Sequence, residues 1–376
     1  MEFGWTEDQR QRYDRTLADT RAAFPAAPEY VFSREKWALL GKFGVLGASV
    51  PADHGGGGLT ALETARVFEA AGRGCPDTGL VFGAAAHLFA CTMPIVDFAP
   101  EALRERLLPG LAAGDLIAGN AMTEPEAGSD VGALRTTATP VEGGFVLDGV
   151  KSFVSNGPVA DVLVTYAVTD PAAGHWGITA FALDAHSPGI AFGEPFAKLG
   201  MEGCVASEVT FTECFVPADA VLGEPGQGSA IFQHSMGWER ACLFALYLGV
   251  QDRLIERCLE HVRGRRQFGK RLAEFQSVSN RIVEMKLRAE SARLLLYRAC
   301  WALDQGEDAK LFAALSKLAV SEAAVASATD AVQLFGSRGY LREQGIEAAL
   351  RDAIGGTIFS GASDVQRQLI AMELGM

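Results

Sequence analysis

The chain has 376 residues, of which 33 are lysine or arginine and 46 are aspartate or glutamate, so its formal net charge at pH 7 is −13. A charge this negative excludes the basic face with which a protein binds nucleic acid. Apolar residues make up 49% of the chain, which is enough for a large core and excludes a disordered protein. At roughly 150 residues per domain, the length predicts two or three domains.

Cysteine and histidine usage indicates the compartment and argues against a metal centre. The seven cysteines include no Cys-x-x-Cys pair, and the six histidines show no metal-ligand spacing. We therefore expect reduced, buried thiols and no metal. The first residues are polar and charged, unlike a signal peptide. These observations predict a cytoplasmic protein.

The first third of the chain has the pattern of helices. Apolar residues at helical spacing, punctuated by glycine and proline, predict helices over residues 7–23, 33–43, 62–71 and 101–113. Residues 78–96 carry no charged side chain, and about 19 such residues could span a bilayer. Because this run contains glycines, a proline and a histidine and lacks basic anchors, we interpret it as a buried helix and expect no membrane partner.

The pattern changes in the middle of the chain. Short runs of β-branched and aromatic residues, bounded by glycine, proline and aspartate, predict strands. These runs lie near residues 144–147, 162–166, 176–182 and 209–211. A small β-domain is therefore expected.

From residue 230 onward the helical period returns. The apolar stripes are long and the breaks between them are short, which is typical of an antiparallel helical bundle. The predicted fold class is α+β, with a helical domain over residues 1–118, a β-domain over 119–226 and a carboxy-terminal four-helix bundle over 227–376.

Two stretches concentrate residues suited to a planar, electron-rich ligand. Residues 121–133 gather hydroxyls and exposed backbone in one loop, which can donate hydrogen bonds to a ring or to a phosphate. Phe153 and Ser155 stand two residues apart and so share one side of a strand. One can stack on a ring while the other bonds its edge. Taken singly, the stretches are equally compatible with a capped connector and a half-buried hairpin.

Taken together, these stretches resemble the acyl-CoA dehydrogenase family of flavoproteins. Residues 121–133 match the first signature of that family, and residues 149–156 resemble its second, with Phe153 where tryptophan is usual. Three later stretches resemble further family elements in the family's order: residues 265–276, 333–340 and 351–367. Ordered motifs are far more specific than any single one.

The resemblance implies an FAD cofactor. Thr123 and Ser155 would bond the edge of the isoalloxazine, Phe153 would lie against the ring, and Ser129 would lie between flavin and substrate. The complete implied set is Met122, Thr123, Ser129, Phe153, Ser155, Arg265, Gln267, Phe268, Gln276, Gln333, Gly336, Ser337, Ser363 and Asp364. Relatives bind the pyrophosphate and adenosine largely across a subunit interface. A homo-oligomer is therefore implied, at least a dimer and commonly a tetramer.

The implied reaction is α,β-desaturation of an acyl thioester, in which a base removes the α-proton and a hydride leaves the β-carbon for flavin N5. Many relatives carry the base as a glutamate directly before the glycine of the carboxy-terminal signature, but here Ser360 precedes Gly361. Branched-chain and long-chain members place it on the first long helix of the bundle, before an arginine. Glu239 and Arg240 occupy that position.

We therefore predict Glu239 as the base, although a glutamate at a helix start can also serve only the helix dipole. The residues expected to contact the substrate are Ser129, Arg240, Ser360 and Gly361, with the backbone N–H of Ser360 as a donor to the thioester oxygen. Five departures from the usual family pattern, at Glu202, Cys204, Ala206, Ser337 and Ala362, limit what can be inferred about the substrate.

A base in this position suits short, branched or cyclic acyl groups. Residues 236–241 are compatible with relatives that act on aminoacyl or prolyl groups held by carrier proteins in secondary metabolism. The expected partners are a thioester of CoA or of a carrier protein and an electron acceptor, either a flavoprotein or O₂. The alternatives are an ordinary short- or branched-chain acyl-CoA dehydrogenase of catabolism, a flavin oxidase or monooxygenase on the same fold, and a non-catalytic paralogue.

A row of basic residues could dock an acidic carrier protein. It consists of Arg253, Arg257, Arg263, Arg265, Arg266, Lys270 and Arg271. An equally good interpretation is a solvated helix face that includes the FAD-binding arginine.

Overall fold

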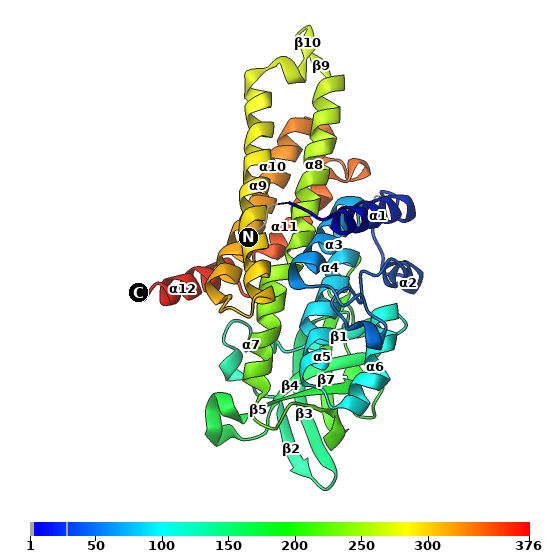
Figure 1. The fold of residues 1–376 in the computed structure, drawn as a ribbon, viewed down its shortest axis with the longest axis vertical. Helices are drawn as coiled ribbons and strands as arrows, with labels where there is room; N and C mark the ends of the chain where they lie inside the picture. The colour runs from blue at the N-terminus through cyan, green and yellow to red at the C-terminus, as the bar shows by residue number, and fades with distance from the viewer. Residues whose placement is uncertain (1–3, 28) are drawn as a thin grey trace.

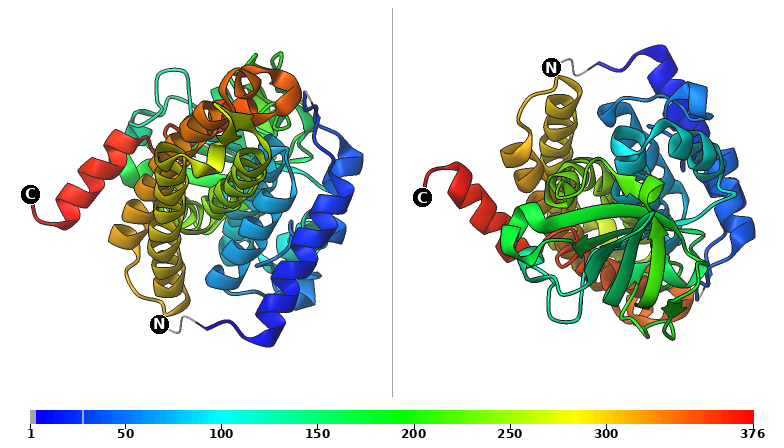
Figure 2. Two further views of the ribbon diagram at one scale, coloured as in Figure 1. Left: turned by 90° about the horizontal axis from the view of Figure 1, so that it is seen from above. Right: turned by 90° about the horizontal axis from the view of Figure 1, so that it is seen from below.

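The computed structural model describes residues 4–27 and 29–376, which form amino-terminal helices, a β-domain and a helical bundle (Figure 1). The β-domain lies at one end of the elongated molecule, and the long bundle helices reach the other end. Figure 2 shows these helices end-on from above and the sheet from below. The predicted α+β fold class, with helical, β and helical parts in that order, is confirmed.

The amino-terminal helices begin at well-capped positions. α1 (Glu7–Ala23) and α3 (Ala61–Gly74) each start with a capping box, built on Thr6 and Thr60. The other α-helices of this part are α2 (Arg34–Lys42), α4 (Thr78–Ala85), α5 (Met93–Phe98) and α6 (Glu101–Ala113). Between α4 and α5 the backbone is π-helical over Ala86–Thr92 (η2).

The run from α4 to α5 is a core element. Among residues 4–27 and 29–376, two helices, Thr78–Phe98 and Lys310–Tyr340, are apolar and long enough to cross a membrane by length and composition alone. The most apolar window of Thr78–Phe98 is 94% buried inside the protein. The uncharged residues 78–96 thus form the buried helix that their composition predicts.

The β-domain is a mixed sheet of eight strands in the order β6-β7-β3-β2-β4-β5-β8, with β1 paired parallel to β4. The strands are β1 (Ala118–Ala121), β2 (Thr137–Val141), β3 (Gly144–Ser155), β4 (Val162–Val168), β5 (Ile178–Asp184), β6 (Ile190–Phe192), β7 (Ala206–Pro217) and β8 (Val221–Leu222). The pairing of β3 with β7 shifts register between Lys151 and Val154. Such an irregularity re-aims the side chains next to it.

The carboxy-terminal part is built on three long helices that run side by side (Figure 1). Its elements are α7 (Gly228–Trp238), the π-helical η7 (Glu239–Leu243), α8 (Ala245–Gly264), β9 (Arg266–Gln267), β10 (Lys270–Arg271), α9 (Gln276–Asp304), α10 (Lys310–Phe335), α11 (Ile346–Gly356) and α12 (Ser363–Glu373). The β9–β10 hairpin joins α8 to α9 at the far tip, and α12 projects from the body of the molecule.

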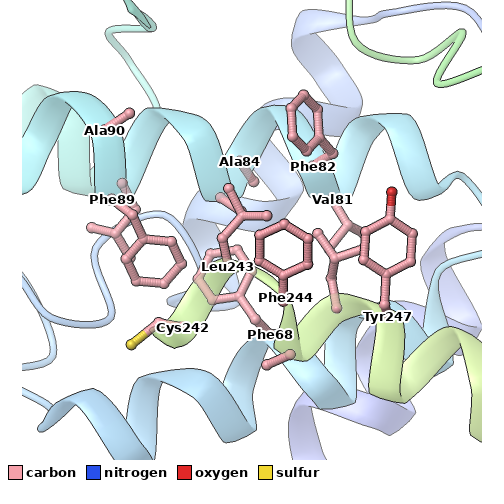
Figure 3. Packing of buried hydrophobic residues seen from close by; sticks show 14 of the residues in the cluster. Phe68, Val81, Phe82, Ala84, Phe89, Ala90, Cys242, Leu243, Phe244 and Tyr247 are labelled. Carbon is pink, nitrogen blue, oxygen red and sulfur yellow. The ribbon is translucent and has the colours of Figure 1, made fainter. Parts of the chain in front are cut away.

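One large core joins the two helical parts (Figure 3). Phe82 on α4 and Phe89 on η2 lie across from Leu243 and Phe244 at the junction of η7 and α8, and all four are buried. The β-domain has a second core of its own. Because protein interiors are close-packed, this shared core fixes η7 in place.

Candidate active site

Glu239 is buried at the point where α7 becomes the π-helical η7, with 6% of its surface exposed. Its Oε2 accepts a hydrogen bond from Ser360 Oγ at 2.7 Å. Its Oε1 is buried and has no partner among the described residues. π-helical turns are rare and often mark functional sites. A carboxylate with one oxygen held and the other free has the arrangement that a proton acceptor needs.

The turn that carries Ser360 is anchored from two sides. The backbone carbonyl of Ser360 accepts hydrogen bonds from Arg240 Nε at 3.2 Å and from Gln366 Nε2 at 3.4 Å. Within the part of the chain that the structure describes, the backbone N–H of Ser360 has no intramolecular acceptor. The structure thus brings together Glu239, Arg240, Ser360 and Gly361, four of the residues predicted to handle the substrate.

Burial dominates the electrostatics of this site. It raises the pKa of Glu239 to about 7, while the hydrogen bond from Ser360 and the charge of Arg240 act in the opposite direction. Cys91 on η2 and Tyr166 on β4 feel the Glu239 charge, and burial raises the pKa of both, so they stay neutral. A carboxyl group with a pKa near 7 is matched to removing a weakly acidic proton at neutral pH.

Aromatic rings pack around the Ser360 turn. The ring of Phe359 lies 4.4 Å from that of Phe82 and 5.6 Å from that of Phe244, measured between centroids. Trp238, next to Glu239, stacks on Phe89 with centroids 6.3 Å apart. An apolar surrounding excludes water and strengthens the electrostatic interactions within the site.

A buried ion pair fixes the loop that follows β1. Lys151 Nζ on β3 donates to Glu124 Oε1 at 2.8 Å and to the carbonyl of Met122 at 3.1 Å. The backbone N–H groups of Arg135 and Thr136 donate to the same Glu124 carboxylate. Burial lowers the pKa of Lys151 to about 8. Burial would raise the pKa of Glu124, but the Lys151 charge and the hydrogen bonds from Lys151, Thr136 and Arg135 together outweigh burial, and the pKa falls below its usual value.

The β3 residues beside this pair present a ring and a hydroxyl. Phe153 is 67% exposed and has a left-handed backbone with φ of 54°, which is rare for a bulky residue. Ser155 is partly exposed two residues further on, and the backbone N–H of Ser152 bonds the carbonyl of Thr123 at 2.7 Å. Thr123, Phe153 and Ser155 are therefore close in the fold. An exposed ring beside hydroxyl donors fits a planar cofactor such as a flavin.

The remaining cofactor candidates lie elsewhere. Arg265, Gln267, Phe268 and Gln276 are exposed around the β9–β10 tip, at the opposite end of the molecule from the β-domain (Figure 1). Phe268 is 93% exposed with φ of 50°. One chain therefore does not bring these residues to Phe153.

Two further groups of candidates have distinct surroundings. Gln333, Gly336 and Ser337 are exposed at the end of α10. Ser363, at the start of α12, has a buried hydroxyl without a partner among the described residues, whereas Asp364 is exposed. An unpartnered buried hydroxyl beside the Ser360 turn is compatible with a bound polar ligand.

Two of the departures near residue 202, Glu202 and Cys204, make structural contacts. Glu202 accepts a hydrogen bond from Arg351 at 2.9 Å, which ties the loop before β7 to α11. Cys204 is buried, with its Sγ 3.6 Å from the Asn156 side-chain oxygen.

Ser129, predicted to lie between flavin and substrate, is exposed in the loop after β1.

The row of basic residues does not form one surface. Arg253 points into the protein, where it bonds the carbonyls of Gly72 and Cys75. Arg257 bonds the carbonyl of Gln344 at 2.6 Å. The exposed members are Arg263, Arg265, Arg266, Lys270 and Arg271. Arg253 and Arg257 thus serve the interior, and any docking face is confined to the tip.

Sequence reasoning missed two interactions that organise the site. The Lys151–Glu124 pair lies within the two recognised motifs, and its signal was a charged residue at an otherwise apolar strand position. The bond from Ser360 to Glu239 joins residues 121 positions apart, and no local pattern announces it.

All three parts of the chain match models of one family. The model described as "Acyl-CoA dehydrogenase, N-terminal domain" matches residues 6–115, the middle-domain model matches 119–214, and the C-terminal-domain model matches 226–375. The chain belongs to the acyl-CoA dehydrogenase family.

Three similar proteins have names or titles that mention proline or a prolyl group. An L-prolyl-[peptidyl-carrier protein] dehydrogenase from Pseudomonas fluorescens is 51% identical over the whole of both chains. The solved structure "PigA with FAD and proline" is 42% identical with a TM-score of 0.97, covering 100% of this chain and 99% of that one. The structure of the "Prolyl Acyl Carrier Protein Oxidase AnaB" is 38% identical with a TM-score of 0.97, covering 99% and 100%.

Proposed function

We propose that this protein is an FAD-dependent dehydrogenase that introduces an α,β double bond into an L-prolyl thioester carried by a carrier protein. The observation that carries the proposal is the buried Glu239 carboxylate, held by Ser360 through one oxygen and free at the other. Family membership supports the reaction class, and identity along the full chain to a prolyl-carrier-protein dehydrogenase supports the substrate.

The chain's own residues fit a flavin on two observations of this structure. Phe153 is an exposed ring beside the hydroxyls of Thr123 and Ser155, and Ser363 has a buried, unpartnered hydroxyl. We assign the ring system to the β3 residues and the loop after β1. Bound FAD supplies the acceptor for the hydride that leaves the β-carbon.

Proton removal is the task of Glu239. With a pKa of about 7, it is largely ionised slightly above neutrality and can take the α-proton through Oε1. As charge develops on the thioester oxygen, the backbone N–H of Ser360 can donate to it. The packed rings of Phe82 and Phe359 keep water away while this happens.

We further propose that the working enzyme is a homo-oligomer, at least a dimer and in its full form a tetramer. The nucleotide-binding candidates at the β9–β10 tip lie at the opposite end of the chain from Phe153, so a second copy must supply them to complete one site. The seven cysteines are free and buried, which supports a reducing cytoplasm as its place of work. The prolyl-carrier-protein relative supports a role in secondary metabolism.

The test is anaerobic bleaching of the flavin by a panel of thioesters. We expect bleaching with L-prolyl carrier protein and much slower bleaching with isovaleryl-CoA. Glu239→Gln should retain FAD and lose the reaction by about 100-fold or more, because a general base contributes roughly that much. Glu307→Gln, an exposed glutamate, is the matched control.

Two results would contradict the proposal: a colourless purified protein, or a Glu239→Gln enzyme that bleaches at the normal rate. Oxygen uptake after mixing with air separates O₂ from a flavoprotein as the electron acceptor.

A further inference from the structure

Ser360 lies beside the buried Glu239, and its hydroxyl contacts the Glu239 carboxylate across 121 positions of sequence. Ser360 Oγ donates to Glu239 Oε2 at 2.7 Å, the usual length of a charge-assisted O–H···O bond. The second oxygen of the same carboxylate makes no hydrogen bond within the described chain. Within the described chain, only one of the two Glu239 carboxylate oxygens is therefore held by a hydrogen bond.

We propose that Ser360 is a positioning residue for the base: its hydroxyl holds Glu239 by Oε2 so that Oε1 faces the α-proton of the substrate. This inference rests on the proposed function, because it presumes that Glu239 is the base. It gives a role to the residue that replaces the usual glutamate.

The backbone around Ser360 shows that its side-chain direction is imposed. Ser360 has φ of 54°, a left-handed conformation that costs free energy for a residue with a Cβ. Arg240 and Gln366 hold its carbonyl, and Gly361 follows with φ of 89°. These bonds keep the turn in a conformation that directs the hydroxyl toward Glu239.

The electrostatics agree with this role. Burial drives the pKa of Glu239 upward, and the Ser360 hydrogen bond is the larger of the two influences that lower it. Arg240 is the second and lies on the same element. Without the hydroxyl, the base would hold its proton to a higher pH.

The other titratable groups around η7 do not substitute for Ser360. Cys91 and Tyr166 are kept neutral by burial, and burial lowers the pKa of His87 on η2 to about 4, so it is also neutral. Lys317 on α10 is buried beside the ring of Phe244; burial and the charge of Arg240 lower its pKa to about 8, and the charge of Glu322 acts in the opposite direction. On α3, Glu69 is paired with Arg293 and Tyr297.

The experiment compares the pH dependence of flavin reduction in the holoenzyme for wild type, Ser360→Ala and Ser360→Gly. We expect the acidic limb of kcat to move upward by about one to two pH units in both variants, with KM little changed. Glycine accepts the left-handed backbone without strain and alanine does not, so agreement between the two assigns the effect to the hydroxyl.

A second measurement does not depend on turnover. The infrared C=O band of the protonated Glu239 carboxyl, identified by its loss in Glu239→Gln, should persist to higher pH in both Ser360 variants. Ser235→Ala is the matched control, since its buried hydroxyl bonds the carbonyl of Phe232 instead of a carboxylate. It should titrate like wild type.

The possible failures can be told apart. If Glu239→Gln is inactive but both Ser360 variants keep the wild-type acidic limb and infrared titration, Ser360 has no positioning role and the proposed function stands. If Ser360→Ala shifts the limb and Ser360→Gly does not, the effect is backbone strain and the inference is overturned. If Glu239→Gln remains active, the proposed function fails together with the inference.

Discussion

The two ends of the predicted site are built in opposite ways. Around Glu239 the polar groups are buried and bonded to one another within a single chain, and aromatic rings surround them. At the β9–β10 tip the candidates are exposed, and Phe268 presents 93% of its surface. The contacts that fix the geometry around Glu239 lie within one chain. The tip has no comparable network of buried contacts among the described residues, and under the proposed function it would act only together with a second copy.

Breaking the buried Lys151–Glu124 pair of the β-domain should have the largest effect on stability. Lys151→Met leaves the Glu124 carboxylate unpaired inside the protein, and we expect the free energy of unfolding to fall by about 3–5 kcal/mol. Denaturant unfolding of the holoenzyme measures the loss, and FAD retention should decline with it because the pair holds the loop of Thr123.

The double variant Lys151→Met/Glu124→Gln should recover much of that stability, since no charge is left buried alone. Lys310→Met, which breaks an exposed pair with Asp308, is the control and should change stability by less than about 1 kcal/mol. An equal loss in the control would remove the contrast between buried and exposed polar groups.

The pH dependence of the free energy of unfolding tests the buried region around Glu239. Its pKa is about 7 in the folded protein against 4.5 as the ordinary value, so ionisation costs the folded state free energy as pH rises through this range. The cost is fully present above pH 7 and absent below pH 4.5. Glu239→Gln should therefore raise stability by about 3 kcal/mol at pH 8 and by progressively less toward pH 5.

Thermal unfolding across this pH range, with Glu307→Gln as an exposed control, measures the difference. A gain that does not depend on pH would mean that the carboxyl group titrates normally.

Substitutions at the exposed β9–β10 tip should have the smallest effect on stability. Phe268→Ala should change the free energy of unfolding by no more than about 0.5 kcal/mol, because the ring contacts little within its own chain. FAD retention upon dilution should nevertheless fall. Trp176→Ala removes another exposed ring, 77% accessible on the β-domain, and should leave FAD retention unchanged. If both variants retain FAD equally, the tip does not contribute to the cofactor site.

Local signals in the sequence predicted the architecture well. The helices at residues 7–23 and 101–113 have the predicted bounds, and α1 is capped by Thr6, whose capping box is a short-range pattern. The buried run at 78–96 followed from composition alone. These features depend on neighbours in the sequence, which is why they could be inferred.

Interactions between distant segments could not be inferred in this way. The burial of Arg253 depends on carbonyls of Gly72 and Cys75, far away in the chain, and a basic residue at its position looks like any solvated one. The π-helical segments η2 and η7 are shifts of backbone hydrogen bonding that leave no mark in residue type. Glu239 itself was found by resemblance, while its contact with Ser360 required the fold.

The number of residues in the π-turn at Glu239–Leu243 determines where the Glu239 side chain points. A π-turn accommodates one more residue than an α-turn, and each α-helical residue turns the chain by about 100°. Deleting one residue after Glu239 would let the wide turn close to an α-turn, and we expect this to change the direction of the Glu239 side chain relative to Ser360. Chain length within this single turn is thus as much a determinant of chemistry as side-chain identity, and redesign of the enzyme must preserve both.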